Sequence, residues 1–141
     1  MTRQAVIDEA MTWLRTPYHN CAKVKGHGVD CGMLLIMVYS KALGMPEFDP
    51  GKYSPEWHLH RSEELYLKYV QMAFDEIPVA DAKPGDALVY KYGRTWSHGA
   101  ILINDTQVIH AYKGLGVIIS GMREHPLDIR HEPRAFKFKG L

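Results

Sequence analysis

The stretch that decides the fold runs from residue 30 to residue 44 and reads Asp30-Cys31-Gly32-Met33-Leu34-Leu35-Ile36-Met37-Val38-Tyr39-Ser40-Lys41-Ala42-Leu43-Gly44. Residues 31–43 are nearly all apolar, and a helix that is apolar on every side is a buried one. Asp30 is a good N-cap residue, and Gly44 is a typical C-cap. We therefore predict a buried helix that begins at Cys31 and ends at Leu43.

The segments on either side of this helix read as further helices separated by connections. Residues 3–14 carry apolar side chains at helical spacing, with Thr2 as a candidate cap and Thr16-Pro17 as the stop. Residues 19–29 have no periodicity and predict a loop. After a long connection over residues 45–60, a second amphipathic helix is expected from Ser62 to Ala73.

From residue 81 onward the apolar pattern changes to a period of two, which is typical of strands. Residues 81–86 form a predicted turn. Strands are then expected at 87–92, 98–103 and 107–112, with further candidates at 117–120 and 135–139. Because helices come first and strands follow, the order favours an α+β fold with an antiparallel sheet. We expect one domain that spans residues 1–141.

The composition excludes several classes of protein. The 141 residues carry a formal net charge of +1, with 46% apolar and 23% charged residues. No run of Lys and Arg supplies a basic patch, so we expect no nucleic-acid partner. No stretch approaches the ~18 apolar residues of a membrane span, so no membrane partner is expected either. The first ten residues lack the apolar core of a signal peptide, which predicts a product made in the cytoplasm and leaves its final location unknown.

Cys31 is placed where a cysteine nucleophile would be expected. A thiol becomes nucleophilic as a thiolate, and the start of a helix favours negative charge through its free N–H groups and aligned dipoles. The same N–H groups can hold the oxyanion of a tetrahedral intermediate. Gly32 leaves room beside the sulfur for a substrate backbone. The alternative is that Cys31 is simply a small buried side chain at the head of a core helix.

Cys21 is a weaker candidate, because it lies in the predicted loop with no helix behind it. Its spacing from Cys31 allows a disulfide, but a protein made in the cytoplasm argues against one.

His98 and His110 are the candidates for the base and its orienting partner. If residues 104–106 form a three-residue turn, Ile103 faces Gln107 and Ala100 faces His110. His98 and His110 then share one strand face as diagonal neighbours, within reach of a hydrogen bond between their rings. A two-residue or four-residue turn would place them on opposite faces. The alternative is that both are ordinary strand histidines.

His58 and His60 alternate in a way that could present two metal ligands on one strand face. No further Cys or His pair with zinc-site spacing accompanies them, so we expect a structural role and no metal or cofactor.

Taken together, these residues resemble the NlpC-type cell-wall peptidases, a family of papain-like cysteine hydrolases. Within that family, the chain is most similar to the short phage-tail-associated branch. The resemblance rests on five fragments in a fixed order: Thr16-Pro17-Tyr18, Lys25-Gly26-His27-Gly28-Val29 running into Asp30-Cys31-Gly32, Lys83-Pro84-Gly85-Asp86-Ala87-Leu88-Val89, Ser97-His98-Gly99-Ala100-Ile101-Leu102, and Val108-Ile109-His110-Ala111. Each fragment is only moderately specific, but their order makes the set strong.

The resemblance implies a papain-like fold in which the N-terminal helices pack on a C-terminal antiparallel sheet. It implies Cys31 as the nucleophile, His98 as the general base and His110 as the residue that orients His98. It also implies that Tyr18 lies beside the nucleophile, and we expect Tyr18, Asp30 and Gly32 to contact the substrate.

The activity that the resemblance implies is hydrolysis of the peptide stems of bacterial murein through a thioester acyl-enzyme. Many members of the family carry a separate wall-binding module, and we expect none within these 141 residues. Two alternatives stay open. One is an amidase or acyltransferase that uses the same Cys-His-His site. The other is a non-catalytic module of phage tail assembly, with tail proteins as partners.

Overall fold

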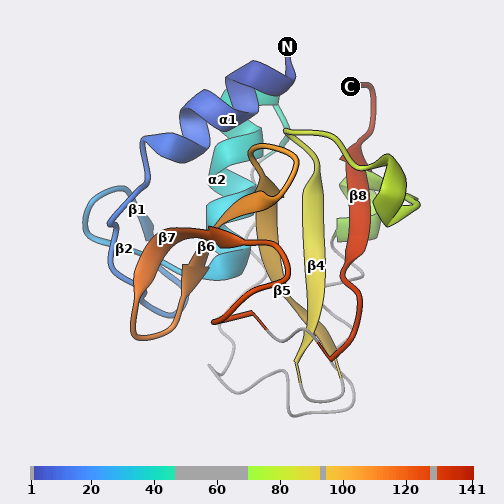
Figure 1. Cartoon of the computed structure of the whole chain (residues 1–141). Coiled ribbons are helices and arrows are strands. Elements are labelled where there is room, and N and C mark those ends of the chain that lie inside the picture. Colours follow the sequence, from blue (N-terminus) through green and yellow to red (C-terminus); the bar gives the residue numbers. More distant parts are fainter. Residues whose placement is uncertain (1, 47–69, 93–94, 128–129) are drawn as a thin grey trace.

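The computed structural model describes residues 2–46, 70–92, 95–127 and 130–141. Within them, two α-helices precede a six-stranded antiparallel sheet (Figure 1), which confirms the predicted α+β order. The elements are α1 (Arg3–Met11), β1 (Lys23–Val24), β2 (Gly28–Val29), α2 (Cys31–Leu43), β3 (Phe74–Ile77), the 3₁₀ helix η2 (Val79–Asp81), β4 (Ala87–Tyr92), β5 (Thr95–Leu102), β6 (Gln107–Tyr112), β7 (Gly116–Gly121) and β8 (Arg134–Phe138).

Helix α2 has the bounds and both caps that the sequence predicts. The Asp30 carboxylate accepts a hydrogen bond of 2.8 Å from the N–H of Met33, which would otherwise lack a partner at the helix start. Gly44 ends the helix with a φ of 71°, a left-handed conformation that glycine adopts without strain. Eight of its residues are buried, as expected for a helix with no polar face.

Helix α1 begins as predicted but ends earlier. The Thr2 hydroxyl caps it by accepting from the N–H of Ala5, and the helix stops at Met11 rather than residue 14. The chain then turns to run beside β7. The Arg15 N–H donates to the Val117 carbonyl at 3.0 Å, and the Val117 N–H donates to the Thr16 carbonyl at 2.9 Å. This long-range pairing competes with the last helical turn, which is why local spacing overestimated the helix.

The sheet has the strand order β3-β8-β4-β5-β6-β7, and all its pairs are antiparallel. Five of these strands match the predicted segments to within a few residues. The turn between β5 and β6 has the three-residue register, since Ile101 pairs with Ile109 and Leu102 with Val108. Asn104 stabilises this turn by accepting from the N–H groups of Thr106 and Gln107.

Strand β3 and the hairpin of β1 and β2 were not predicted. Some other predictions lie outside the described residues. Strand β3 follows directly on a helical turn at residues 70–73, where only a helix was expected. The short hairpin of β1 and β2 occupies the predicted loop. His58 and His60, and the expected helix over residues 62–69, are among the residues that the structure does not describe.

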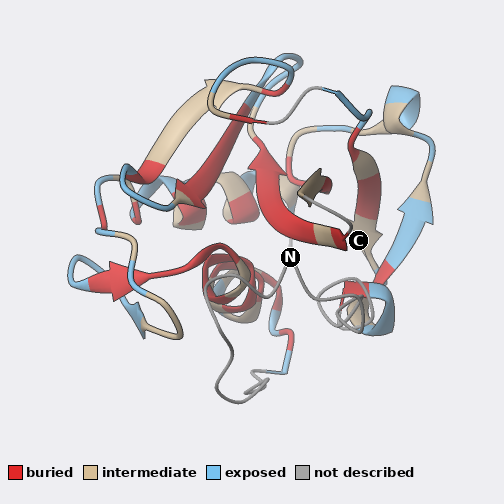
Figure 2. Ribbon diagram, turned by 90° about the horizontal axis from the view of Figure 1, so that it is seen from below, coloured by how far each residue is buried: buried red, intermediate tan, exposed pale blue. Residues whose placement is uncertain are grey.

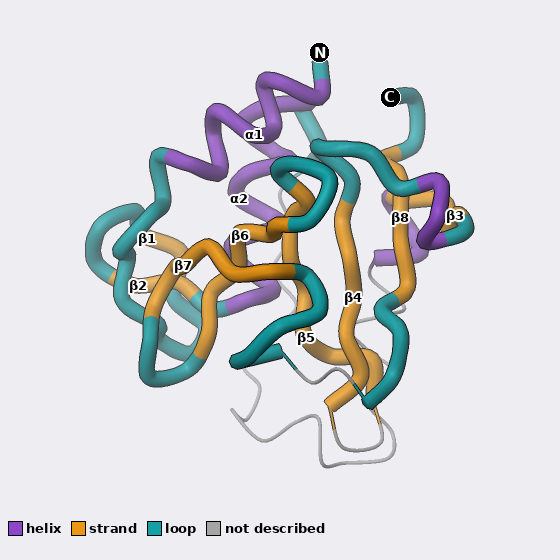
Figure 3. Tube along the Cα trace, in the orientation of Figure 1, coloured by secondary structure: helices purple, strands orange, loops and turns teal. Residues whose placement is uncertain are grey.

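The central strands β4 and β5 are buried on both faces of the sheet, whereas the edge strands β3 and β7 are partly exposed (Figure 2). One face carries Ala87, Val89, Ile101, Ile109 and Phe136, and α2 packs on it over β5 and β6, with α1 packed against α2 (Figure 3). The opposite face is a second, smaller core, whose buried members are Leu88, Tyr90, Ala100, Leu102, Val108, Met122, Leu127 and Ala135. Burial on both faces explains why the first four residues of β4 are apolar without alternation.

Candidate active site

Cys31 is the first residue of α2, and its sulfur lies against the middle of β5. The β5–β6 ladder consists of the pairs Ile101–Ile109 and Leu102–Val108, and β5 begins six residues earlier, at Thr95. The sulfur of Cys31 lies beside the part of β5 that precedes these two pairs. Its thiol donates to the Ser97 carbonyl at 3.6 Å, and the Gly99 N–H donates to the sulfur. The helix start is therefore fixed to the strand that carries His98.

A bulge in β5 shapes this contact. Tyr90 of β4 pairs with His98, whereas Lys91 pairs with Trp96, so Ser97 is an extra residue on β5. An extra residue of this kind bends the strand and redirects the side chains beside it. Ser97 is buried, and its carbonyl is the one that accepts from Cys31.

The protonation state of Cys31 differs from the expectation. Burial, the largest effect, and the neighbouring Asp30 carboxylate raise the pKa of the thiol to about 12. The N–H groups of Gly99, Gly32 and Cys31 itself lower the pKa, but by less. The N–H groups of the helix start thus lower the thiol pKa as expected, but desolvation of a fully buried sulfur outweighs them, and the net shift is upward.

His98 and His110 are joined by a direct hydrogen bond. The distance from His98 Nε2 to His110 Nδ1 is 2.9 Å, which confirms the shared strand face predicted from the three-residue turn. His110 is fully buried and His98 is 8% exposed. Burial lowers the pKa of His110 to about 4, and burial together with His110 lowers the pKa of His98 well below 6.5. Both rings are therefore neutral at neutral pH.

Aromatic rings surround His98 and restrict its orientation. The ring centroids of Tyr92 and Tyr112 lie 5.3 Å and 5.4 Å from that of His98, and Tyr90 lies at 6.3 Å. The hydroxyls of Tyr90 and Tyr92 donate to the carbonyls of Met122 and Pro126. Since Nε2 of His98 is occupied by His110, its Nδ1 is the ring nitrogen left for another partner.

Tyr18, Asp30 and Gly32 all lie close to Cys31. Besides capping α2, the buried Asp30 carboxylate accepts from the Cys21 N–H at 2.7 Å, so it ties the preceding loop to the helix start. Tyr18 bridges to Val29, and burial, followed by the charges of Cys31 and Asp30, raises the pKa of its phenol. Gly32 directs its N–H at the sulfur.

Cys21 is half-buried and Cys31 is buried, and no disulfide joins the two. The side-chain amide of Asn20 donates to the Cys21 sulfur at 3.4 Å. Cys21 has a φ of 63°, which places the loop in a sharp turn at the point where Asp30 holds it.

Ser120 of β7 joins the histidine pair and was not identified from the sequence. Its Oγ lies 2.9 Å from His110 Nε2. A serine at a strand end is unremarkable as sequence. Only the register between β6 and β7 could have indicated its role, because Ser120 pairs with Val108 and is thus a diagonal neighbour of His110.

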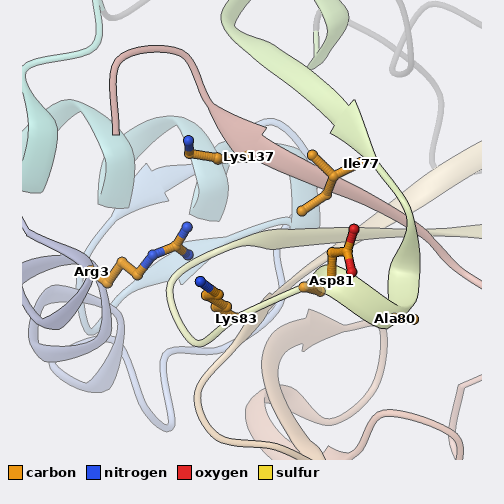
Figure 4. A pocket seen from close by; sticks show the side chains of 7 residues that line it. Arg3, Ile77, Ala80, Asp81, Lys83 and Lys137 are labelled. Carbon is orange, nitrogen blue, oxygen red and sulfur yellow. The ribbon is translucent and has the colours of Figure 1, made fainter.

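A separate pocket of about 620 Å³ lies between the start of α1, η2 and β8 (Figure 4). It is lined by Arg3, Ile77, Ala80, Asp81, Ala82, Lys83 and Lys137. Arg3 is anchored to Asp86 at 2.7 Å, and Gly85 bonds to Leu102, whereas Cys31 contacts Ser97. Leu102 and Ser97 are five residues apart on β5, which is roughly 17 Å along an extended strand, so the pocket lies far from the Cys31 sulfur. The pocket lining includes no cysteine or histidine, so the nucleophile and base candidates lie elsewhere.

No group of three or more His, Cys, Asp or Glu side chains among the described residues is arranged to hold a metal ion. Nor does any of their helices have the length and apolar character needed to cross a membrane.

Comparisons with known proteins agree with this architecture. The model of the NlpC/P60 family matches residues 15–130. The NlpC/p60 domain of the peptidoglycan hydrolase SagA superposes with a TM-score of 0.68 at 24% identity, covering 98% of this chain and 100% of that one. The peptidoglycan hydrolase RipB from Mycobacterium tuberculosis gives 0.58 at 20% identity, covering 96% and 63%.

A third solved structure, an NLP/P60 family protein similar to a lipoprotein from Staphylococcus aureus, gives 0.64 at 22% identity, covering 96% of this chain and 41% of that one. The chain thus spans all of the SagA domain but less than half of the staphylococcal protein. No curated protein sequence matches the chain. At these identities the structural matches establish the fold, which is that of the papain-like domain expected from the sequence.

Proposed function

Because the chain belongs to the NlpC/P60 family, we propose that it is a cysteine peptidase that hydrolyses the peptide stems of bacterial murein. In this proposal Cys31 is the nucleophile, His98 the general base, and His110 the residue that orients His98. The observation that carries it is the 2.9 Å hydrogen bond between His98 of β5 and His110 of β6, because β5 is also the strand whose Ser97 carbonyl contacts the Cys31 thiol. Two of the similar structures are described as peptidoglycan hydrolases, which supports murein as the substrate.

The proposed reaction starts from a neutral thiol and a neutral imidazole, because the pKa of Cys31 is raised and that of His98 lowered. Nδ1 of His98 takes the thiol proton as the sulfur attacks the scissile carbonyl carbon. The N–H groups of Cys31 and Gly32 stabilise the resulting oxyanion. When the carbon–nitrogen bond breaks, His98 returns the proton to the leaving amine and a thioester remains. Water then attacks the thioester with His98 again as base, releasing the acid and restoring the thiol.

Tyr18, Asp30 and Gly32 would bound the substrate site in this scheme. Asp30 acts mainly on the architecture, since both its carboxylate oxygens are engaged by backbone N–H groups. Gly32 presents no side chain beside the sulfur, so a peptide backbone can approach. Tyr18 closes the site from the side of the loop that leads into β2.

The test is turnover of purified murein by the parent protein and by Cys31→Ala and Cys31→Ser, with released fragments identified by mass spectrometry. We expect both variants to lose turnover while their circular dichroism and melting curves stay close to those of the parent. Cys21→Ser is the matched control and should keep the parental rate. Digestion of murein by Cys31→Ala at the parental rate would show that Cys31 is not the nucleophile.

The same assay separates the other candidate functions. An acyltransferase would transfer the acyl group to an added amine in preference to water, and an amidase would release a different set of fragments. A phage tail module without catalysis would give no fragments with any substrate. The expected place in the short phage-tail-associated branch rests on the sequence resemblance alone.

A further inference from the structure

The hydrogen-bonded chain that starts at His98 does not end at His110. His110 Nε2 lies 2.9 Å from Ser120 Oγ, and Ser120 Oγ lies 3.4 Å from the Gly121 carbonyl oxygen, to which its hydroxyl donates. His110 is fully buried, whereas Ser120 is half-buried. Four groups from three strands therefore form one series, from His98 through His110 and Ser120 to the backbone of β7.

The end of this series determines which nitrogens carry protons. When the Ser120 hydroxyl donates to the Gly121 carbonyl, which can only accept, the Ser120 oxygen is left to accept from His110. His110 then carries its proton on Nε2, and its Nδ1 accepts from His98 Nε2. A neutral imidazole carries one proton, so His98 Nδ1 is left with a free lone pair.

The opposite orientation of the hydroxyl would reverse every bond in the series. If Ser120 donated to His110 Nε2, the His110 proton would move to Nδ1 and point at His98. His98 would then carry its proton on Nδ1, where it could not accept one from a thiol. A single hydroxyl orientation thus decides whether His98 is prepared to act as a base.

We propose that Ser120 is a positioning residue that sets the tautomer of His110 and, through it, leaves Nδ1 of His98 free to take the Cys31 proton. This rests on the proposed function for its catalytic consequence, whereas the tautomers themselves are a property of the free protein. Ser120 does not touch the reacting atoms, and it acts only through His110.

The tautomers are measured by nitrogen-15 NMR of the parent protein labelled at histidine, without substrate. We expect His98 and His110 each to be protonated on Nε2 and bare on Nδ1. In Ser120→Ala the acceptor for His110 is gone, so both rings should show a mixture of tautomers, and Ser120→Thr should restore the parental pattern. Protonation of His110 on Nδ1 in the parent would overturn the proposal without any variant.

The kinetic arm uses the same variants on murein. Loss of one hydrogen bond of about 1.4 kcal/mol changes the tautomer ratio of His110 about tenfold. The kcat of Ser120→Ala should therefore fall, by up to about tenfold, with KM nearly unchanged. Ser120→Thr should recover most of the rate. Ser40→Ala is the matched control, since Ser40 is a serine whose buried hydroxyl has no partner in the described part of the chain.

The two arms distinguish failure of this inference from failure of the proposed function. A parent that does not digest murein contradicts the proposed function, and the NMR result still decides the role of Ser120. A parent that digests murein and a Ser120→Ala variant with the parental kcat and the parental tautomers would refute the inference. A fall in both kcat and melting temperature that Ser120→Thr does not reverse would also refute it, because that is the behaviour of a merely structural residue.

Discussion

Replacing His110 by Gln should make the stability of the protein less sensitive to acid. His110 is fully buried, and burial lowers its pKa from 6.5 to about 4. In the unfolded chain the imidazole is solvated and binds its proton near the ordinary value. Between these two pKa values the unfolded chain binds more protons than the folded protein. The free energy of unfolding therefore decreases as the pH falls through this range.

The magnitude follows from the difference between the two pKa values of His110. A difference of about 2.5 at 1.36 kcal/mol per pKa unit corresponds to about 3 kcal/mol. This stability is fully present above the unfolded pKa of about 6.5 and is lost as the pH falls toward the folded pKa of about 4. A loss of this size is large against the ~5–15 kcal/mol by which a domain is usually stable.

The assay is urea unfolding followed by circular dichroism at about pH 7 and about pH 4, for the parent and for His110→Gln. Carboxylates titrate in both proteins, so their effect cancels when the two pH dependences are subtracted. We expect the parent to lose about 3 kcal/mol more than the variant over this range. Ser120→Ala is the control, because it leaves His110 buried and should keep the parental dependence. An identical loss in parent and His110→Gln would refute the reasoning from burial.

Three further predictions concern the site. The acid limb of kcat/KM should have its midpoint well below 6.5, because the base form of His98 persists until its lowered pKa is reached, and a midpoint at or above 6.5 would contradict this. Asp30→Asn, made in a Cys21→Ser background, can keep the cap on Met33 through its amide oxygen but gives up the second bond, to the N–H of residue 21. It removes the charge that raises the pKa of Cys31, so the midpoint of alkylation by iodoacetamide should shift to lower pH; an unchanged midpoint would mean that the Asp30 charge does not contribute to the raised thiol pKa. Metal chelators should leave murein turnover unchanged, and a loss that zinc restores would revive a metal role for the histidines.

Much of the fold could be predicted because its signals are local. The bounds of α2 follow from an Asp30 carboxylate that satisfies a free N–H and from a Gly44 that adopts a positive φ, and both effects act within one helical turn. The His98–His110 pair was also predictable, since a three-residue turn at residues 104–106 is enough to set the register of two adjacent strands.

The unpredicted parts depend on partners far away in the sequence. Strand β3 pairs with β8, in register from Phe74 with Phe138 to Ile77 with Ala135. Its four residues read Phe74-Asp75-Glu76-Ile77 and do not alternate between apolar and polar, so only the pairing with β8 identifies them as a strand. The early end of α1 has the same origin, because Arg15 and Thr16 pair with Val117 rather than with the helix.

The sequence by itself determined the α+β order, the central helix with Cys31 at its start, and the two histidines on one strand face. Only the tertiary structure decided how these groups are protonated and oriented. The pKa of Cys31 is raised because packing of α2 against β5 removes the sulfur from water, and that burial outweighs the free N–H groups of the helix start. Likewise, Ser120 meets His110 only because β7 pairs with β6. Helix caps and turns act over a few bonds, whereas desolvation and contacts between strands arise only when distant segments pack together.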